Sequence, residues 1–210
     1  YLYKIEKNAK KIGAVNTVVI KNSKLYGFNT DLAGIKSSIQ NLRIKKSHKI
    51  LVIGSGGTSR TTIFCLKNIF KFKHIFLISR NNKKCKKIKK EFNIQIISNY
   101  NEHKKFDLLI NCTPLGMKGL LNKLPVSINI IKTSKYVIDF VNKPSETRFV
   151  KIAKRYHKKT ISGTFISLNQ LKEQFFLYTN IKSNYKIIER INNKLQKSSR
   201  ITTKSRCCLQ

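Results

Sequence analysis

The chain has 210 residues and a mass of 24.3 kDa, enough for one ordinary domain or two small ones. Hydrophobic residues make up 40% of it, which argues against wholesale disorder, and the lack of an 18-residue apolar run excludes a transmembrane helix. The 44 Lys and Arg residues outnumber the 9 Asp and Glu residues and give a formal net charge of +35.

Such a charge ordinarily indicates nucleic acid or an anionic membrane surface as a partner. Here 36 of the 44 basic residues are Lys, and residues with A/T-rich codons are abundant while Ala and Pro are rare. Selection for phosphate or base recognition tends to favour the planar fork of Arg. We therefore attribute the charge mainly to codon drift, and predict no specific nucleic acid and no membrane as partner.

The cysteines and the N-terminus indicate the compartment. An odd number of cysteines argues against a disulfide framework, and their spacing fits no metal site. The N-terminus lacks the apolar core of a signal peptide. We predict no metal and a reducing compartment, the cytoplasm, with an organelle left open. The cysteines are Cys65, Cys85, Cys112, Cys207 and Cys208.

The first part of the chain predicts two strands and a helix. Residues 12–20 are typical of a strand, 21–24 of a turn, and 25–29 of a second strand. Between 31 and 41, Leu32, Ile35 and Ile39 recur on one helical face, with Asp31 near the N-cap.

From residue 49 onward, strands alternate with helices. The continuous apolar run 49–54 is typical of a strand buried on both faces of a parallel sheet. The alternation predicts a Rossmann-type doubly wound parallel sheet. Two helices then follow at 145–157 and 165–178, and we expect the basic tail from 183 to be loosely ordered. The predicted strands are 49–54, 74–79, 94–98, 106–112 and 135–141, and helices are expected at 58–70 and 83–92.

A glycine-rich loop carries the sharpest functional signal. Gly54, Gly56 and Gly57 directly follow a buried strand and open a helix. Glycines there permit a tight turn and a close backbone approach to a pyrophosphate, which lies at the helix N-terminus. This context predicts a dinucleotide site.

The end of the next strand indicates which dinucleotide is bound. NAD enzymes usually place an acid there to hold the ribose 2′-hydroxyl. This chain has Ser79, Arg80 and Asn81 instead. Arg80 can stack on an adenine and clamp a 2′-phosphate, with Lys84 as a second cation. We therefore predict NADP as the cofactor.

Further blocks of the sequence carry a family resemblance over about residues 12–180. They are 13–17 (GAVNT), 29–31 (NTD) with Gly34, the glycine loop ending in Arg60, 111–117 (NCTPLGM), Asp139 with Pro144 and Thr147, and Gly163 with Gln170. Together these blocks resemble the shikimate dehydrogenase family. The T-S-R that follows the glycines is also similar to the dehydrogenase segment of fused pentafunctional aromatic-pathway enzymes.

The resemblance implies NADPH-dependent interconversion of 3-dehydroshikimate and shikimate, a step of chorismate and aromatic amino acid biosynthesis. It implies Asp31 as the catalytic acid of a Lys–Asp pair, with a homodimer left open. Asn16, Asp31 and Gln170 would contact the substrate. The implied cofactor residues are Gly54, Ser55, Gly56, Gly57, Thr58, Arg60, Ser79, Arg80, Asn81, Lys84, Thr113, Phe140 and Gly163.

This sequence departs from the family pattern in several places. The family's lysine, in a Val-Thr-x-Pro-x-Lys setting upstream of the GAVNT block, has no match, so we expect an N-terminally truncated chain that binds NADP but turns over slowly or not at all. Asn142 stands in place of a Tyr, Ile166 and Ser167 in place of Met-Leu, and Cys112 in place of Ala.

We expect four parts: a partial α/β substrate-binding domain (1–47), an NADP-binding domain (48–160), a helix returning to the substrate domain (161–182) and a basic tail (183–210). The tail ends in Cys207-Cys208-Leu209-Gln210, which fits a prenylation box but is attributed to chance. Two alternatives are a dehydrogenase of quinate or another polyol acid, and a basic module that binds nucleic acid or membrane on a Rossmann scaffold.

Overall fold

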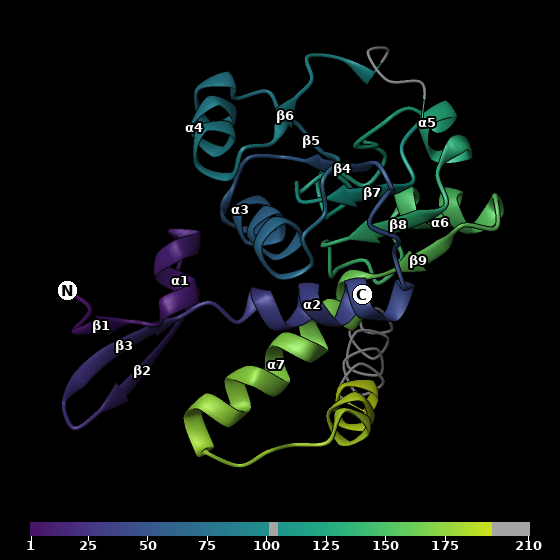
Figure 1. Ribbon diagram of the computed structural model, residues 1–210. Helices are drawn as coiled ribbons and strands as arrows, with labels where there is room; N and C mark the ends of the chain where they lie inside the picture. Colours follow the sequence, from purple (N-terminus) through teal and green to yellow (C-terminus); the bar gives the residue numbers. More distant parts are fainter. Residues whose placement is uncertain (101–104, 195–210) are drawn as a thin grey trace.

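The computed structural model describes residues 1–100 and 105–194 and consists of two lobes (Figure 1). The larger lobe is built on a six-stranded sheet in which every pairing is parallel. The strand order is β6-β5-β4-β7-β8-β9, the doubly wound order of a Rossmann fold, so the predicted fold is confirmed. Its strands are β4 (Ile50–Ile53), β5 (Ile75–Ile78), β6 (Gln95–Ile96), β7 (Leu108–Asn111), β8 (Tyr136–Asp139) and β9 (Lys159–Ile161).

Helices cover both faces of this sheet because its central strands are apolar on both sides. All four residues of β4 and of β7 are buried. One face packs against α3 (Gly57–Phe64), its π-helical continuation η1 (Cys65–Ile69) and α4 (Asn82–Phe92). The other packs against α5 (Ile128–Thr133) and α6 (Arg148–Arg155). The core is therefore two apolar layers separated by the sheet.

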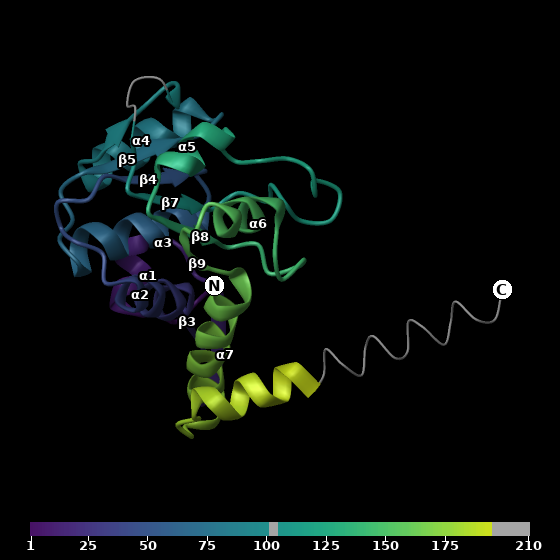
Figure 2. The same cartoon turned by 90° about the vertical axis from the view of Figure 1, so that its right-hand side faces the viewer.

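The smaller lobe comes from both ends of the described chain. It contains a three-stranded sheet of order β1-β3-β2, with β1 parallel and β2 antiparallel to β3. Helices α2 and α7 pack against each other at the junction with the larger lobe (Figures 1 and 2). Its elements are β1 (Lys4–Ile5), α1 (Lys7–Ile12), β2 (Thr17–Lys21), β3 (Lys24–Phe28), α2 (Asp31–Leu42) and α7 (Gly163–Thr179).

The structure corrects the predicted start of the first strand. Residues 12–16 are not a strand, because α1 ends at Ile12 and Gly13 adopts the left-handed conformation (φ 69°) that closes a helix C-terminus. The strand begins only at Thr17. The short elements β1, α1, α5 and β9 were not predicted from the sequence.

The predicted loose tail is also corrected in part. Residues 185–194 form a further helix, drawn in yellow in Figure 2. The Tyr185 ring lies 5.9 Å from the ring of Phe165 in α7, and Ile188 is buried, so an apolar contact anchors this helix. Cys207-Cys208-Leu209-Gln210 lies outside the described residues. Of the described helices, none is long and apolar enough to cross a membrane.

Candidate cofactor and substrate site

The glycine-rich loop lies at the carboxyl edge of the parallel sheet, between β4 and α3. Gly54 has a φ of 110°, and a Cβ there would lie 3.0 Å from the Cys112 carbonyl oxygen and 3.0 Å from Thr113 Cγ2. Only glycine fits this position without strain. Gly56 is the N-cap of α3, and a Cβ there would meet nothing within 4 Å. The loop therefore leaves open space in front of a helix N-terminus, where backbone amides favour an anion.

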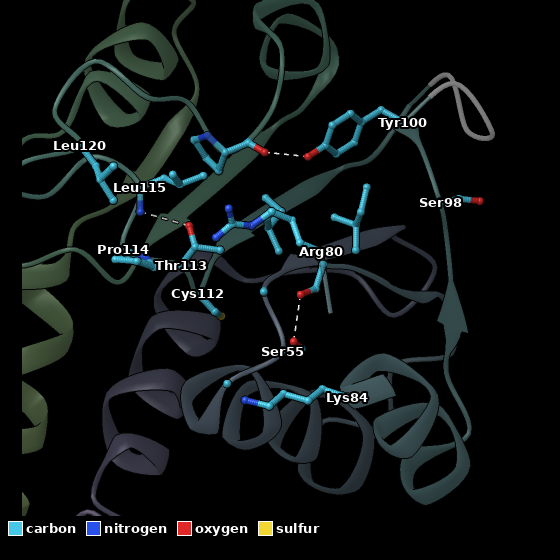
Figure 3. A pocket seen from close by; sticks show the side chains of 16 residues that line it. Ser55, Arg80, Lys84, Ser98, Tyr100, Cys112, Thr113, Pro114, Leu115 and Leu120 are labelled. Carbon is cyan, nitrogen blue, oxygen red and sulfur yellow. Dashed lines mark hydrogen bonds between the residues drawn. The ribbon is translucent and has the colours of Figure 1, made fainter. Parts of the chain in front are cut away.

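A cavity of about 690 Å³ adjoins this loop (Figure 3). The predicted residues Ser55, Ser79, Arg80, Lys84 and Thr113 all line it, and the Oγ atoms of Ser55 and Ser79 are 2.9 Å apart. Arg80 and Lys84 are exposed, so both cations are available to a phosphate. Among the residues that the structure describes, the lining contains no acid, which favours a cofactor that carries an additional phosphate.

The outer wall of this cavity includes a residue that sequence reasoning missed. Tyr100 lines the cavity, and its hydroxyl donates a 2.7 Å hydrogen bond to the Pro125 carbonyl oxygen. The bond joins the segment after β6 to the loop before α5 and closes that side of the cavity. No local motif marks Tyr100, because its partner lies 25 residues away in the chain.

A second cavity, of about 490 Å³, lies on the other side of the loop that follows β7. Thr58, Thr113 and Phe140 line it, together with Cys112 and Asn142. The cavity is mostly apolar. Burial raises the pKa of the Cys112 thiol to about 12, so this side chain behaves as a neutral, unreactive group.

Gly163 packs beneath this second cavity. A Cβ at Gly163 would overlap the carbonyl group of Val141, a residue of the cavity lining. Glycine therefore lets the start of α7 approach the loop after β8.

A buried hydrogen-bond network sets the shape of the loop between the two cavities. Asn111 Oδ1 accepts bonds from Thr113 N (3.0 Å) and Thr113 Oγ1 (2.6 Å), and Asn111 Nδ2 donates to Asp139 Oδ1 (3.0 Å). Asp139 also accepts bonds from Thr147 Oγ1 and Val141 N. Burial raises the Asp139 pKa, and the Thr147 bond opposes that shift. The network ties together the ends of two neighbouring strands.

A polar cluster on the smaller lobe brings together the three predicted substrate residues. Asp31 Oδ1 accepts hydrogen bonds from Asn16 Nδ2 and from Gln170 Nε2, the latter 3.0 Å long. Burial raises the pKa of Asp31, and the Asn16 bond opposes the shift. Asn16 precedes β2, Asp31 begins α2 and Gln170 lies in α7, so three separate segments supply the cluster.

Further hydrogen bonds support this cluster from behind. Asn16 Oδ1 accepts from Thr30 N (2.9 Å) and from Thr17 Oγ1 (3.0 Å). Gln174 Nε2 donates to the hydroxyls of Thr17 and Thr30 at 3.3 and 3.2 Å. Sequence reasoning missed Gln174, although its position four residues after Gln170 on the same helix was a usable signal.

The cluster and the cavities lie within electrostatic range of one another. Asp31, on the smaller lobe, and Asp139, on the larger, both act to raise the pKa of the Cys112 thiol in the cavity wall. Asn29 links the lobes directly, since its Nδ2 donates to Ala14 O (3.0 Å) and to Thr61 Oγ1 (3.1 Å) in α3.

Two of the predicted cofactor residues have other contacts. Asn81 Oδ1 caps α4 by accepting a bond from Lys84 N (2.9 Å). Arg60 lines a smaller cavity beside Gly56, and its guanidinium bonds to Ile12 and Glu91. In the part of the chain that the structure describes, no group of three or more His, Cys, Asp or Glu side chains could hold a metal ion.

Comparison with known proteins identifies the family. The chain is 39% identical over 170 residues to the shikimate dehydrogenase (NADP(+)) of Clostridium perfringens strain ATCC 13124, covering 79% of this chain and 62% of that protein. It is 36% identical over 207 residues to the enzyme of the same name from Methanococcus maripaludis strain C6, covering 93% of this chain and 73% of that protein. The chain belongs to the shikimate dehydrogenase family.

Solved structures agree with this membership. Shikimate dehydrogenase from Aquifex aeolicus superposes with a TM-score of 0.80 at 32% identity, over 90% of this chain and 70% of that one. The Thermus thermophilus shikimate dehydrogenase, solved with NADP(H) and shikimate, gives 0.81 at 25% identity, over 92% and 72%. No family model matches the chain. The chain spans about six tenths to three quarters of the length of these shikimate dehydrogenases, and the predicted family is confirmed.

Proposed function

We propose that this chain serves the NADP-dependent interconversion of 3-dehydroshikimate and shikimate. One observation carries the proposal: Asn16 and Gln170, from distant segments, converge on Asp31, which lies within electrostatic range of Cys112 in the wall of the large cavity. Shikimate is a cyclic polyol acid, and an acid flanked by two amides matches adjacent hydroxyls, which both donate and accept hydrogen bonds. The relatives named above carry the same activity in their names.

The cofactor residues fit NADP. The loop Gly54–Thr58 offers an open cradle and a helix N-terminus for the pyrophosphate. Arg80 and Lys84 would hold the additional phosphate on the adenosine, because both are exposed cations in the cavity lining. Thr113, Phe140 and Gly163 would border the nicotinamide end. When bound, NADPH supplies the hydride that reduces the ketone.

Asp31 would control the proton that accompanies this reduction. Its Oδ1 is held by two amide donors, which fix the plane of the carboxyl group. Partial burial raises its pKa and so makes it a better proton acceptor than an exposed Asp. We assign it to accept a proton from the substrate hydroxyl in the oxidative direction and return it in the reductive direction, with a lysine partner implied by the family resemblance.

Asn16 and Gln170 would orient both Asp31 and the substrate. Each amide uses one N–H on Asp31 and retains a second N–H for a substrate oxygen. The Asn16 carbonyl oxygen is already occupied by the amide of Thr30, so this side chain cannot flip without losing a bond. The cluster is therefore preorganised.

The test measures binding and turnover separately. NADPH is titrated by its fluorescence, shikimate is then titrated calorimetrically into the NADPH complex, and NADP⁺ reduction by shikimate is followed at 340 nm. We expect saturable NADPH binding, shikimate binding that Asp31→Ala abolishes, and any turnover to depend on Asp31. A chain that binds NADPH but no shikimate would contradict the proposed substrate.

Two rival functions are outcomes of the same experiment. A preference for quinate over shikimate would identify a relative acting on another polyol acid. Binding of a structured RNA or of anionic vesicles that falls steeply with salt and competes with NADPH would favour a basic module on a Rossmann scaffold. The cytoplasmic location and the homodimer stay predictions.

A further inference from the structure

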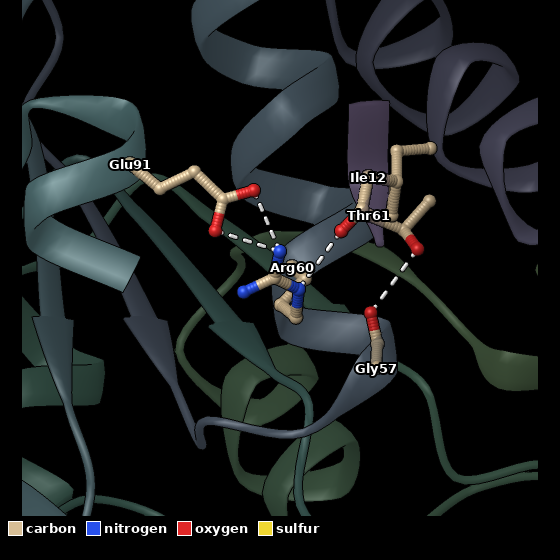
Figure 4. Close-up of polar contacts among 5 residues, drawn as sticks. All are labelled: Ile12, Gly57, Arg60, Thr61 and Glu91. Atoms are coloured by element: carbon tan, nitrogen blue, oxygen red, sulfur yellow. Dashed lines mark hydrogen bonds and ion pairs between the residues drawn. The ribbon is translucent and has the colours of Figure 1, made fainter. Parts of the chain in front are cut away.

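Arg60 has contacts that a cofactor-binding role does not explain. It lies in the first turn of α3, and its side chain is only 16% exposed. Its Nε donates a 2.8 Å hydrogen bond to the carbonyl oxygen of Ile12, the last residue of α1 in the smaller lobe. Its Nη2 lies 2.6 and 2.7 Å from the two carboxylate oxygens of Glu91 in α4 (Figure 4).

The surrounding residues are shaped to hold this guanidinium. Its Cζ lies 5.6 Å from the centre of the Phe92 ring, next to Glu91 at the end of α4. A Cβ on Gly13 would lie 2.8 Å from Arg60 Nη2, so glycine leaves room for the side chain as well as closing α1. Three elements from two lobes thus meet at one side chain.

The segment held by Arg60 leads directly into the substrate cluster. Residues 12–16 connect the end of α1 to Asn16, whose amide bonds to Asp31. Midway along this segment, Ala14 packs against the glycine loop, 3.9 Å from the position of a Cβ on Gly57. The placement of Asn16 relative to the cofactor loop therefore depends on how this segment is fixed to α3.

We propose that Arg60 is a positioning residue that fixes segment 12–16, and through it Asn16 and Asp31, against the cofactor loop. Glu91 neutralises and orients the guanidinium so that Nε faces the Ile12 carbonyl. This inference rests on the proposed function for its catalytic consequence, but the contact itself is independent of any activity. The competing interpretation is a phosphate contact, since Arg60, Lys84 and Lys87 line a cavity of about 380 Å³ beside Gly56.

Hydrogen exchange and cofactor binding separate the two interpretations. Variants Arg60→Gln, Arg60→Lys and Glu91→Gln of the full chain are compared with Arg80→Gln, a variant of the expected phosphate site. Arg155→Gln, an exposed arginine in α6, is the matched control. Amide exchange is measured by mass spectrometry on peptides covering residues 12–16, and NADPH affinity by fluorescence titration.

For Arg60→Gln we expect exchange in peptides covering 12–16 to accelerate about tenfold to hundredfold, as suits the loss of one charged hydrogen bond between the lobes. The Kd for NADPH should stay within about twofold of the wild type. Arg60→Lys should give an intermediate exchange rate, because an ammonium group lacks the planar set of N–H donors with which the guanidinium bonds to Ile12 and Glu91 at once. Glu91→Gln should act in the same direction but more weakly.

Where the wild-type chain turns over shikimate, Arg60→Gln should raise the KM for shikimate without raising the KM for NADP⁺. The inference is overturned if Arg60→Gln weakens NADPH binding as much as Arg80→Gln does and leaves exchange at 12–16 unchanged. If Arg60→Gln does not fold, Glu91→Gln and Arg60→Lys distinguish the two interpretations by the same measurements, amide exchange at 12–16 and NADPH affinity. A wild-type chain that fails to bind NADPH contradicts the proposed function, while the exchange measurement still tests the contact.

Discussion

Gly34 lies where α2 crosses α7, and its substitution by alanine tests how helix packing holds the Asp31 cluster together. A Cβ there would lie 2.7 Å from Ile166 Cγ2 and 2.8 Å from the Ile166 carbonyl oxygen. The side chain can rotate, but the backbone oxygen cannot. Moving from 2.8 Å to the 3.4 Å of ordinary contact requires the helices to separate by roughly 0.6 Å.

This separation of the helices would lengthen the hydrogen bond between Gln170 and Asp31. Asp31 lies one turn before Gly34 on α2, and Gln170 lies one turn after Ile166 on α7, so both pairs share the same helix faces. Stretched from 3.0 Å toward roughly 3.6 Å, the Gln170–Asp31 contact would no longer be a hydrogen bond. We expect Gly34→Ala to destabilise the fold by about 1–3 kcal/mol and to weaken shikimate binding about tenfold.

Urea unfolding and shikimate titration provide the assay, with Lys36→Ala on the exposed face of the same helix as control. Helix propensity alone predicts the opposite sign of the stability change, because replacing a mid-helix glycine with alanine ordinarily stabilises a helix by about 1 kcal/mol. A Gly34→Ala chain that is as stable as the wild type, or more stable, and binds shikimate normally would refute the packing argument.

Four other substitutions test the remaining assignments. Arg80→Gln should weaken NADPH binding about tenfold to hundredfold and leave NADH binding unchanged, as measured by fluorescence titration, because it removes a charged contact to the additional phosphate. Asp31→Asn should abolish turnover but raise Tm at neutral pH. Because the pKa of Asp31 is higher in the folded than in the unfolded chain, the carboxyl group costs stability as pH rises from the unfolded-state pKa to the folded-state pKa. The gain in Tm from the substitution should therefore vanish at pH values below the unfolded-state pKa. In turnover measurements as a function of pH, Asn16→Ala should move the acid limb of the pH–activity profile to higher pH, because it removes the hydrogen bond that lowers the Asp31 pKa. Thr147→Val should destabilise by about 1–3 kcal/mol in urea unfolding, because it leaves the buried Asp139 carboxyl short of a donor.

The parallel sheet and the cofactor loop could be predicted because their signals are local. β4 is a continuous apolar run, β7 is apolar up to its last residue, Asn111, and the glycines directly follow β4. The positive φ of Gly54, and the 3.0 Å that would separate a Cβ there from the Cys112 carbonyl oxygen, require glycine at the position where the sequence has it. The lack of an acidic residue directly after β5, which predicted NADP, could likewise be recognised from the sequence.

The contacts that join the lobes could not be predicted in this way. Arg60 follows the glycines closely, so a phosphate role was the natural expectation, yet its partners lie 48 and 31 residues away in the chain. The apolar residues of 12–20 favoured a strand, although Gly13, which follows Lys10, Lys11 and Ile12, is also a helix C-cap signal. The helix at 185–194 packs on Phe165 through Tyr185, a tertiary contact that local composition, which suggested a loose tail, does not reveal.

The most direct test of the central claim is a paired titration of the chain with NADPH and NADH, monitored by nicotinamide fluorescence. The arrangement of Gly54, Ser55, Gly56, Arg80 and Lys84 around one cavity predicts saturable, one-to-one NADPH binding that is at least tenfold tighter than NADH binding. Arg80→Gln should remove most of that preference. Equal affinity for the two nucleotides, or no saturable binding of either, would contradict the proposal that this chain uses NADP.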